Sequence, residues 1–547
     1  MSKPTQCSID PKIAVLLAIL FTTAGCRQTT GRPSAQPSYT PGGSVDPGSS
    51  WVPTGPASYV DVNGNNTSGD GSQENPWATL SHACSRVTTA GEAIIIGAGT
   101  YHDSKQCVLA PGVSIKGAGR TQTTIISSLN APYIQAVSNP VVDGNQFVSD
   151  FRLDGNNKAL LNGINVTGRN HFTIKNIDFI RIKYKAISLQ GTEWWTHAEQ
   201  DYPAVPPPAY ATGILVKDVT ISGCSSNQFQ AAVWVQSLED AIFDNIVVDE
   251  SAATGGQGNP MKSWPGWLKH CTIKNSTFTV NQNNLGVNPE PITLELWNLE
   301  QDTEIYNNTF NDGYISLVSG RKNGGTNALS FHDNRLNNSA PLGVAHELAV
   351  SYTDFYNNSI HTQSLGIWAA THMYNFDGLT DIRVHHNVIR STKGSNIQIQ
   401  NGPGAVAFNN IAVYNNVLDS TDGTWPNAGV LVSPNLNTTF SNISIQNNIF
   451  TNLGVGVYFY GENSWRVQRP AIKYNDFWNV GKQVQNDGVT SPTISNNYSL
   501  DPLFMKTGAR PNPYYLLQTS SPLINMGANV GLPYLGTAPD IGAYEMR

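Results

Sequence analysis

Short segments in which apolar and polar residues alternate recur along most of the chain, and they come in pairs. The first members of the pairs share an asparagine near the middle: Phe172–Phe179, Cys271–Phe278, Glu304–Phe310, Val384–Ile389, Val413–Leu418, Ile445–Phe450 and Ile472–Phe477. The second members follow at short distance: Ala186–Gln190, Val233–Gln236, Leu294–Trp297, Ile315–Val318, Ile367–Ala369, Ile397–Gln400 and Val457–Tyr460. Alternation with a period of two is typical of strands with one buried face, so the pattern predicts a repeat of short β-strands.

The interval from Leu294 to Leu317 fits one coil of a parallel β-helix, and longer intervals indicate inserted loops. Asparagine suits a corner that recurs in every coil, because it tolerates the left-handed conformation and hydrogen-bonds nearby backbone groups. Stacked coils would bring these amides into a ladder. A β-propeller would need longer blades and a leucine-rich repeat would need a leucine framework, and neither pattern fits. The repeat therefore predicts a parallel β-helix.

The two ends of the repeat region carry recognisable segments. Asn75–Cys84 has helix spacing, would cover the N-terminal end of the core, and precedes predicted strands at Ala93–Ile96 and Gly99–Tyr101. The opening segments Tyr59–Gly64, Gly69–Ser72, Asn75–Leu80 and Gly97–Tyr101, and the closing segments Leu500–Phe504 and Asp540–Glu545, resemble those of pectate-lyase-like β-helix proteins. The resemblance covers residues 58–547 and implies an all-β, single-stranded right-handed parallel β-helix (solenoid) with an N-terminal capping helix. That superfamily holds lyases, hydrolases, epimerases and non-catalytic adhesins, so the resemblance implies a fold rather than one reaction.

Residues 1–25 have the features of an export signal. The apolar run Ile13–Phe21 is shorter than the about 20 residues that span a bilayer. It leads to Thr23–Cys26, which resembles the cleavage box of bacterial lipoproteins and implies acylation of Cys26 and anchoring at the outer membrane or cell surface. Ordinary secretory cleavage is the alternative. Residues 26–57 are rich in Pro, Gly, Ser and Thr, and they are predicted to form a flexible tether.

The sequence contains 6 cysteines. Cys7 would leave with the signal, and Cys26 is the predicted lipidation site. Cys84 and Cys107 flank a helix-to-strand passage, and an exported protein meets an oxidising compartment, so a disulfide between them is predicted. Cys224 and Cys271 lack the spacing of a metal site and are predicted to be small buried residues.

Composition narrows the class of partner. Only 13% of the residues are charged, and the formal net charge of −7 argues against a nucleic-acid-binding protein, which would carry a basic surface. The 49 glycines and 32 prolines agree with a chain of frequent turns. No cofactor and no metal is required by the sequence.

The second strands predict two columns of outward side chains, because alternate residues of a strand face opposite sides. One column holds Trp234, Glu295, Ser316, Trp368 and Gln398, and its neighbour holds Gln236, Trp297, Val318, Ala370 and Gln400. Aromatic rings can stack on sugar rings and amides can bind hydroxyl groups, so this face is predicted to bind a sugar chain. The loops Glu193–Pro208 and Glu239–Lys269, the latter with Trp264 and Trp267, are predicted to wall it. Packing of the tryptophans beneath these loops is the alternative.

Glu295 is the principal candidate catalytic residue, because a carboxylate among apolar strand neighbours suits a general acid. Glu347 is its candidate partner two coils on. Coils stack about 4.8 Å apart, and inverting glycosidases hold their carboxyl groups about 6.5–9.5 Å apart. A slip of one residue would exchange Glu347 with His346, so this pairing depends on the register. The alternative is that Glu295 only pairs with a cation such as Arg321 or Lys322.

Cations suggest a rival activity. Arg181, Lys183 and Lys185 alternate and predict a positive strand face, and Arg321 and Lys322 follow a strand of the sugar-binding face. Such cations would suit a polysaccharide lyase, which must neutralise the carboxylate of an acidic sugar and would admit Ca²⁺; a solvated strand face is the alternative. The sequence lacks the clustered aspartates and lysine motif of some pectate lyases and the paired aspartates of polygalacturonases.

The sequence therefore predicts an exported polysaccharide-degrading enzyme. A glycoside hydrolase stands ahead of a lyase acting on a uronate-containing glycan, and a non-catalytic glycan-binding surface protein is the third interpretation. The predicted substrate-binding residues are Trp234, Gln236, Trp297, Arg321, Lys322, Trp368, Gln398 and Gln400. The protein is predicted to be monomeric, to bind no nucleic acid, and to contact the membrane only through its lipid anchor.

Overall fold

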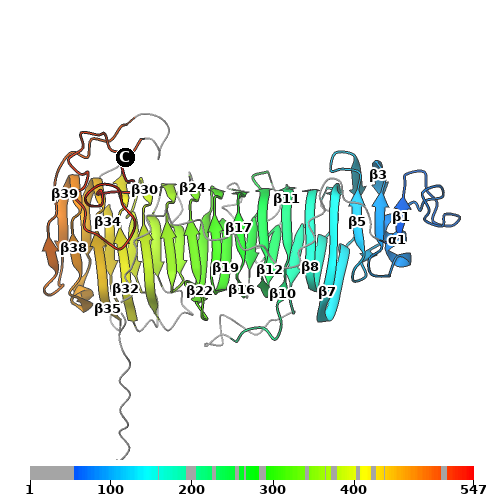
Figure 1. Cartoon of the computed structure of the whole chain (residues 1–547), viewed down its shortest axis with the longest axis horizontal. Helices are drawn as coiled ribbons and strands as arrows, with labels where there is room; N and C mark the ends of the chain where they lie inside the picture. The colour runs from blue at the N-terminus through cyan, green and yellow to red at the C-terminus, as the bar shows by residue number, and fades with distance from the viewer. Residues whose placement is uncertain are drawn as a thin grey trace, which may run out of the picture. The chain divides into compact units, whose positions relative to one another are not determined.

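The computed structural model describes residues 55–157, 159–192, 205–224, 230–252, 258–263, 266–281, 291–338, 344–363, 365–370, 378–401, 407–420, 427–435, 438–506 and 514–546. The predicted signal peptide, the lipidation site Cys26 and almost all of the predicted tether lie outside these ranges. Within them, parallel strands stack coil on coil into a right-handed β-helix of about 12 turns (Figure 1). The predicted fold class is confirmed.

Three parallel sheets form the sides of the helix, and some long strands bend from one sheet into the next. Sheet 1 contains β1 (Ala57–Val60), β2 (Ala93–Ile96), β5 (Ser114–Gly117), β7 (Pro132–Asp154), β8 (Asn162–Ile180), β11 (Leu215–Ser222), β14 (Ile242–Asp249), β17 (Thr272–Lys274), β20 (Thr303–Tyr306), β23 (Leu329–His332), β26 (Thr353–Tyr356), β29 (Leu379–His385), β32 (Ala407–Tyr414), β35 (Thr439–Gln446), β38 (Ala471–Lys473) and β40 (Thr493–Ser495). Sheet 2 adds β3 (Gly99–His102), β6 (Thr123–Ile126), β18 (Thr277–Thr279), β21 (Thr309–Asn311), β24 (Arg335–Asn338), β27 (Ser359–Thr362), β30 (Val388–Ser391), β33 (Val417–Ser420), β36 (Ile449–Phe459) and β39 (Asp476–Asn486). Sheet 3 adds β4 (Cys107–Val108), β9 (Ile187–Gln190), β12 (Val233–Gln236), β15 (Met261–Ser263), β19 (Ile292–Glu300), β22 (Tyr314–Arg321), β25 (Val344–Ala349), β28 (Leu365–Ala370), β31 (Ile397–Gln400) and β34 (Ala428–Ser433).

A few short elements complete the coils. Strands β10 (Ala211–Thr212), β13 (Leu238–Glu239) and β16 (Leu268–Lys269) lie between sheets 3 and 1, and β37 (Val467–Gln468) pairs with β35. The part of the chain that the structure describes contains two helices, α1 (Leu80–Arg86) and the 3₁₀ helix η2 (Glu462–Arg466). Among the described residues, no helix is both long and apolar enough to cross a membrane.

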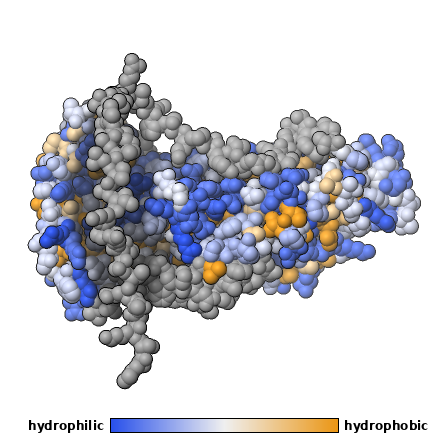
Figure 2. Space-filling model, turned by 60° about the horizontal axis from the view of Figure 1, so that its bottom comes forward, coloured by the Kyte–Doolittle hydropathy of each residue, from blue (hydrophilic) through white to orange (hydrophobic). Residues whose placement is uncertain are grey.

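One apolar core runs through the coils from Val60 to Val489. Inward side chains stack on their counterparts in the next coil, as the rings of Phe331 and Phe355 do with centroids 4.9 Å apart. The outer surface in Figure 2 is mainly hydrophilic, with apolar residues in separate small patches. The alternation in the sequence therefore predicts which side chains of a strand face the core and which face outward.

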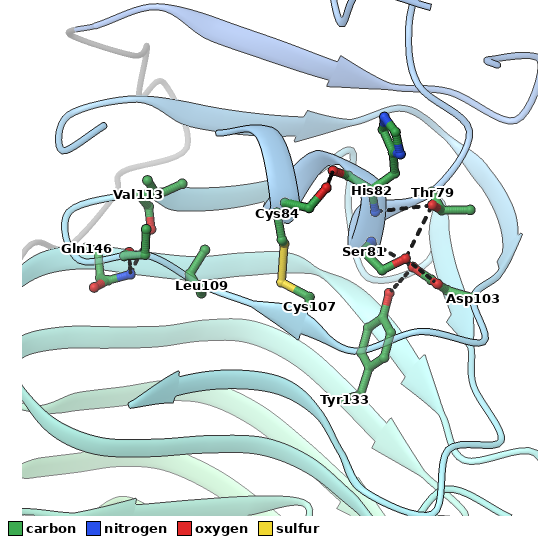
Figure 3. Close-up of a disulfide and its surroundings, with 12 residues drawn as sticks. Thr79, Ser81, His82, Cys84, Asp103, Cys107, Leu109, Val113, Tyr133 and Gln146 are labelled. Carbon is green, nitrogen blue, oxygen red and sulfur yellow. Dashed lines mark hydrogen bonds between the residues drawn. A yellow bond between two sulfur atoms is a disulfide. The ribbon is translucent and has the colours of Figure 1, made fainter. Parts of the chain in front are cut away.

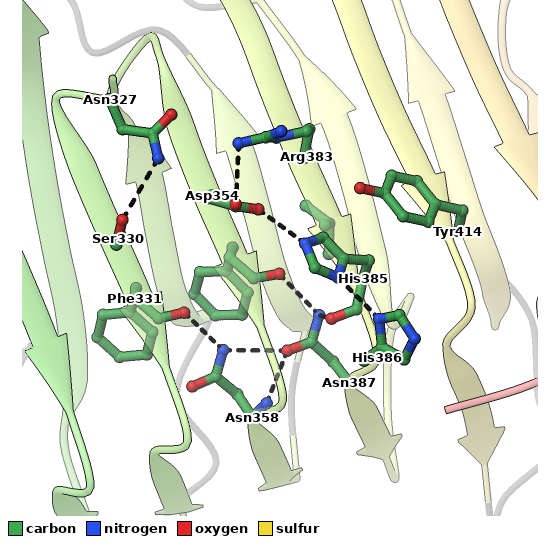
Figure 4. A network of polar contacts seen from close by, with 12 residues as sticks. Asn327, Ser330, Phe331, Asp354, Asn358, Arg383, His385, His386, Asn387 and Tyr414 are labelled. Atoms are coloured by element: carbon green, nitrogen blue, oxygen red, sulfur yellow. Dashed lines mark hydrogen bonds and ion pairs between the residues drawn. The ribbon is translucent and has the colours of Figure 1, made fainter. Parts of the chain in front are cut away.

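At the Asn-Asn corners between sheets 1 and 2, the two asparagines have different structural roles. The first asparagine takes the left-handed conformation, with φ of 55° at Asn307 and 54° at Asn357. The second points inward and joins a ladder of amides in which Nδ2 of one coil donates to Oδ1 of the next. Asn358 donates to Asn387 at 3.0 Å (Figure 4). Asn387 in turn donates to Asn416 at 3.0 Å. The predicted asparagine ladder is confirmed.

Helix α1 packs on the N-terminal end of the core, where the sequence predicts a capping helix. Thr79 accepts a hydrogen bond from the His82 amide at the start of the helix, and Asp103 accepts two from Ser81 (Figure 3). Cys84 of the helix and Cys107 of β4 form a disulfide with a Cα–Cα distance of 5.3 Å. Cys224 and Cys271 are both buried.

Candidate functional site

The strand register of sheet 3 places one outward residue of each coil in a continuous column. Its members pair directly in consecutive coils: Trp234, Lys262, Glu295, Ser316, Glu347, Trp368 and Gln398. We call this set the Glu295 column. Neighbouring members lie about 4.8 Å apart along the axis, which is the spacing of paired strands.

Glu295 lies in the middle of this column and has two close partners. Its Oε2 atom is 2.5 Å from Nζ of Lys262 in the preceding coil, and its Oε1 atom accepts a hydrogen bond of 2.8 Å from Nε1 of Trp297. The cation is therefore neither Arg321 nor Lys322, the two alternatives that the sequence suggested. An ion-paired carboxylate is better suited to accept a proton than to donate one.

Glu347 lies two coils from Glu295, with Ser316 between them. The side chain is buried, and its Oε2 atom accepts a hydrogen bond of 2.6 Å from the Ser316 hydroxyl. The structure therefore brings the two predicted carboxylates onto one face, with their backbones about 10 Å apart at the spacing of stacked strands.

His346, the neighbour of Glu347, faces the core. It lies between Ile315 and Ile367 in the register, and its ring contacts Phe331 and Phe355 edge-on at 4.9 and 5.0 Å. Burial lowers the pKa of His346 to about 3, so the ring is neutral. The register that places Glu347 outside thus buries a histidine inside.

The tryptophans of this face are not exposed stacking platforms. Trp234 and Trp297 are only 2% and 4% exposed, and Trp297 packs with Val318 and Ala349. Trp368 is half-buried. Trp234 and Trp297 lie on the predicted side of their strands but are covered, so the prediction that they are exposed is wrong. Alternation predicts which side of a strand a residue faces, and it does not predict whether other residues cover it.

The other predicted binding residues divide between this face and a second region. Gln236 is buried, whereas Gln400 is half-buried and accepts a hydrogen bond from Gln398. Arg321 pairs in register with Glu300 and lies over the Trp267 ring at 5.2 Å, and Lys322 lies over the Tyr352 ring at 4.8 Å. These two cations lie at the far end of β22 and do not join the Glu295 column.

The predicted cationic strand Arg181–Lys185 is wrong. Arg181 turns the chain at a φ of 56°, and no strand covers residues 181–186. Arg181 forms an ion pair with Asp154, and Lys183 lies over the Tyr184 ring. Lys185 alone of the three reaches the Glu295 column, where Nζ lies 4.4 Å from the Trp234 ring centroid.

Sequence reasoning missed Lys262 because it assigned residues 239–269 to a loop. The described part of this segment is instead a further coil with strands β14, β15 and β16. The alternating run Ile242–Val248 was the available signal. Trp267 is buried in this coil, whereas Trp264 and residues 193–204 of the other predicted wall lie outside the described residues.

Exposed aromatic residues lie farther along the same sheet. Tyr458 continues the outward row of sheet 3, and Tyr460 follows it with 48% of its surface exposed. Trp465 in η2 is 53% exposed. These two side chains are more exposed than the tryptophans Trp234 and Trp297, although Arg466 lies over the Trp465 ring at 4.4 Å.

A second polar cluster lies on sheet 1 (Figure 4). Nε2 of His385 lies within hydrogen-bond distance of Asp354 Oδ1, at 2.8 Å, and its Nδ1 lies 2.8 Å from Nδ1 of His386. Arg383 forms an ion pair with Asp354 at 2.9 Å. The His385 ring is stacked between Tyr356 and Tyr414. Both of its nitrogens are engaged and both of its faces are covered, so this cluster stabilises the coil stack rather than offering a base to a ligand.

The described residues contain no group of three or more His, Cys, Asp or Glu side chains arranged to hold a metal ion. The side chains of the Glu295 column supply two carboxylates, a lysine, a serine hydroxyl, tryptophan N–H groups and a glutamine amide.

Comparison with known proteins gives only structural likeness. No protein-family profile matches the sequence, and no curated protein matches it at a significant level. Among solved structures, the chain is similar to the catalytic unit of a GH87 α-1,3-glucanase from Streptomyces thermodiastaticus, with 15% identity, coverage of 81% of this chain and 70% of that one, and a TM-score of 0.38. It is also similar to an alginate lyase from Paenibacillus sp. (11% identity, 66% and 95% coverage, TM-score 0.34) and to the pectate lyase Pel9A (13% identity, 90% and 97% coverage, TM-score 0.31). Likeness at this level assigns no activity to the chain.

Proposed function

We propose that this protein is a polysaccharide-degrading glycoside hydrolase whose site is the Glu295 column. The observation that carries the proposal is the placement of Glu295 and Glu347 in one outward column, two coils apart. Backbones about 10 Å apart allow the carboxyl separation of about 6.5–9.5 Å that leaves room for a water molecule in inverting enzymes.

The contacts of the two carboxylates suggest different roles. Glu295, held by Lys262 and the Trp297 N–H, would act as the base that activates water. Glu347, which is buried and bonded to the Ser316 hydroxyl, would protonate the leaving oxygen. The sugar chain would lie along the axis of sheet 3, with Trp368, Gln398 and Gln400 as contacts beyond the carboxylates.

A polysaccharide lyase is the second candidate, and two lysines favour it. Lys262 lies inside the column, and Lys185 lies over Trp234 at its edge. An acidic sugar could exchange its own carboxylate for that of Glu295 as the partner of Lys262. In that reaction the lysine would neutralise the uronate and would favour loss of the proton next to it, with Ca²⁺ as an added neutralising group.

A non-catalytic glycan-binding protein is the third candidate. The ion pair between Lys262 and Glu295 already neutralises both charges, as expected for a surface that binds sugar without cleaving it. This alternative differs from the other two in predicting binding without products.

The test is incubation of the purified protein with a panel of neutral and uronate-containing polysaccharides. New reducing ends without ultraviolet absorption would support the hydrolase, and unsaturated, ultraviolet-absorbing ends would support the lyase. Retention on an insoluble polysaccharide without any cleavage would favour the non-catalytic protein.

A further inference from the structure

A polar cavity lies on sheet 2, away from the Glu295 column on sheet 3. The C-terminal segment folds over the outer face of sheet 2, where Phe504, Tyr515, Leu517, Leu523 and Ile541 pack against Val388, Val417 and Ile449. A cavity of about 280 Å³ remains at the edge of this apolar contact. Its lining comes from both the sheet and the C-terminal segment.

The floor of the cavity is part of a register column. Asp419, Thr451 and Trp478 occupy equivalent outward positions in consecutive coils, and Arg390 precedes them. Asp419 is buried and Thr451 is only 3% exposed, whereas Trp478 is 36% exposed at the rim. A buried carboxylate, a hydroxyl and an open aromatic face thus follow one another at about 4.8 Å intervals.

Asp419 is held rigidly at this place. Its Oδ1 atom accepts a hydrogen bond of 2.8 Å from Nδ2 of Asn452, its Oδ2 atom accepts one from the Tyr515 hydroxyl, and Arg390 Nε lies 3.6 Å from Oδ2. Such partners fix the orientation of the carboxylate and compensate its burial. The group is therefore preorganised to accept further hydrogen bonds from a ligand.

The C-terminal segment supplies the opposite wall. Asp501, Phe504, Lys506, Tyr514 and Tyr515 line it, and the rings of Tyr514 and Tyr515 meet edge-to-face with centroids 4.9 Å apart. The lining holds two carboxylates and one lysine, and Arg390 of the preceding coil pairs with Asp419. Because the acceptor Asp419 is itself a carboxylate, a second carboxylate beside it would be repelled, whereas a neutral ligand with several hydroxyl groups would find acceptors on both walls.

We propose that this cavity binds a single neutral sugar ring, with Trp478 stacked on the ring and Asp419 and Thr451 bonded to its hydroxyl groups. The cavity lies just below the size range of drug-binding pockets, about 300–1,000 Å³, and so suits one ring rather than a chain. The ring is either a free monosaccharide or the end of a glycan chain. This proposal does not depend on the activity proposed for sheet 3.

The test is isothermal titration of the full-length protein with D-glucose, D-galactose, D-mannose and D-galacturonate. We expect one or more of the neutral sugars to bind, and D-galacturonate to bind at least tenfold more weakly. Trp478→Ala should weaken that binding at least tenfold, and Asp419→Asn should weaken it while keeping the shape of the floor. Thermal melting of each variant checks that it is folded.

Trp465→Ala is the matched control, because it removes an exposed tryptophan that does not line the cavity. It should leave binding unchanged, as should Glu295→Gln, which separates this site from the site on sheet 3. A disaccharide of the bound sugar that binds more tightly identifies a chain end as the ligand, and equal binding identifies the free sugar. Absence of binding by every neutral sugar, preference for D-galacturonate, or unchanged binding by folded Trp478→Ala would overturn the proposal.

Discussion

Adjacent asparagines in one corner have unequal effects on stability. Asn357 is exposed and takes a φ of 54°, whereas Asn358 is buried, donates to the Phe331 carbonyl and to Asn387, and accepts from the Asn334 amide. Each buried backbone group that loses its hydrogen-bond partner lowers the free energy of unfolding by about 1–3 kcal/mol. Asn358 therefore contributes more to the free energy of unfolding, whereas Asn357 allows the chain to turn.

We expect Asn358→Ala to lower the free energy of unfolding by about 2 kcal/mol or more, because it leaves the Phe331 carbonyl and the Asn334 amide without partners. Asn357→Gly should change it by less than about 1 kcal/mol, since glycine adopts the left-handed conformation readily. Chemical denaturation of the two variants measures both. Equal losses in the free energy of unfolding would show that the asparagine ladder does not stabilise the corner.

Asp476 makes stability depend on pH. Burial raises the pKa of this carboxyl from 3.8 to about 7, although the Leu500 amide donates to Oδ1 at 2.8 Å and opposes the rise, and Asp501 adds to it. The folded protein therefore holds a proton that the unfolded chain has already released. Stability from this group is fully present below about pH 4 and is lost as the pH rises to about 7.

Asp476→Asn should therefore raise the melting temperature at pH 8 by about 2 °C or more and change it little at pH 4, because the amide resembles the protonated acid. Thermal unfolding at the two pH values gives the comparison. A variant that is less stable than the parent at pH 8 would contradict this assignment.

At the scale of the strand, alternation predicts the side of each residue well. Leu294 and Leu296 are inside and Glu295 is outside, as expected. Alternation does not predict what covers a residue, so it could not decide between exposed tryptophans and the alternative of buried ones, which holds for Trp234 and Trp297. It also fails where a corner residue such as Arg181 interrupts a run, and where long connections separate the strands of one coil, as between Asp249 and Met261.

The inside and outside assignment has a direct test. Leu296→Asp should destabilise the neighbouring coils by several kcal/mol, because it places an unpaired charge in a dry core. Gln400→Asp, on the outward side of the same sheet, should keep the melting temperature within about 2 °C. If circular dichroism shows equal melting temperatures for the two variants, the assignment of faces is wrong.

At the scale of the whole molecule, the fold follows from the repeat, whereas the site does not. Successive coils from Asn308 to Asn497 repeat the same asparagine corner, so this part of the sequence predicts the β-helix at every repeat. Lys262 and Glu347 each occur once, and their meeting with Glu295 depends on the register between coils. The cavity beneath the C-terminal segment is formed by residues that are far apart in the sequence, such as Asp419 and Tyr515. No local sequence pattern predicts it.

We propose that the chain is exported and anchored through an acylated Cys26, which lies outside the described residues. Cys26→Ser should move the protein from the membrane fraction to the soluble fraction, because it removes the acyl acceptor. The melting temperature of the β-helix should not change, because the described core runs from Val60 to Val489. Unchanged fractionation in the cell would contradict the anchor.

The most direct test of the central claim is the turnover of Glu295→Gln and Glu347→Gln on whichever polysaccharide the parent protein cleaves. Each substitution keeps the shape of the side chain and removes its acid–base function, so turnover should fall by about 10²–10⁴ while affinity for the polysaccharide is retained. Glu239→Gln is the matched control, because Glu239 is also paired with a lysine, Lys269, but lies outside the Glu295 column. The account predicts normal turnover for the control and losses for both column variants. Full turnover by Glu295→Gln or by Glu347→Gln would contradict it.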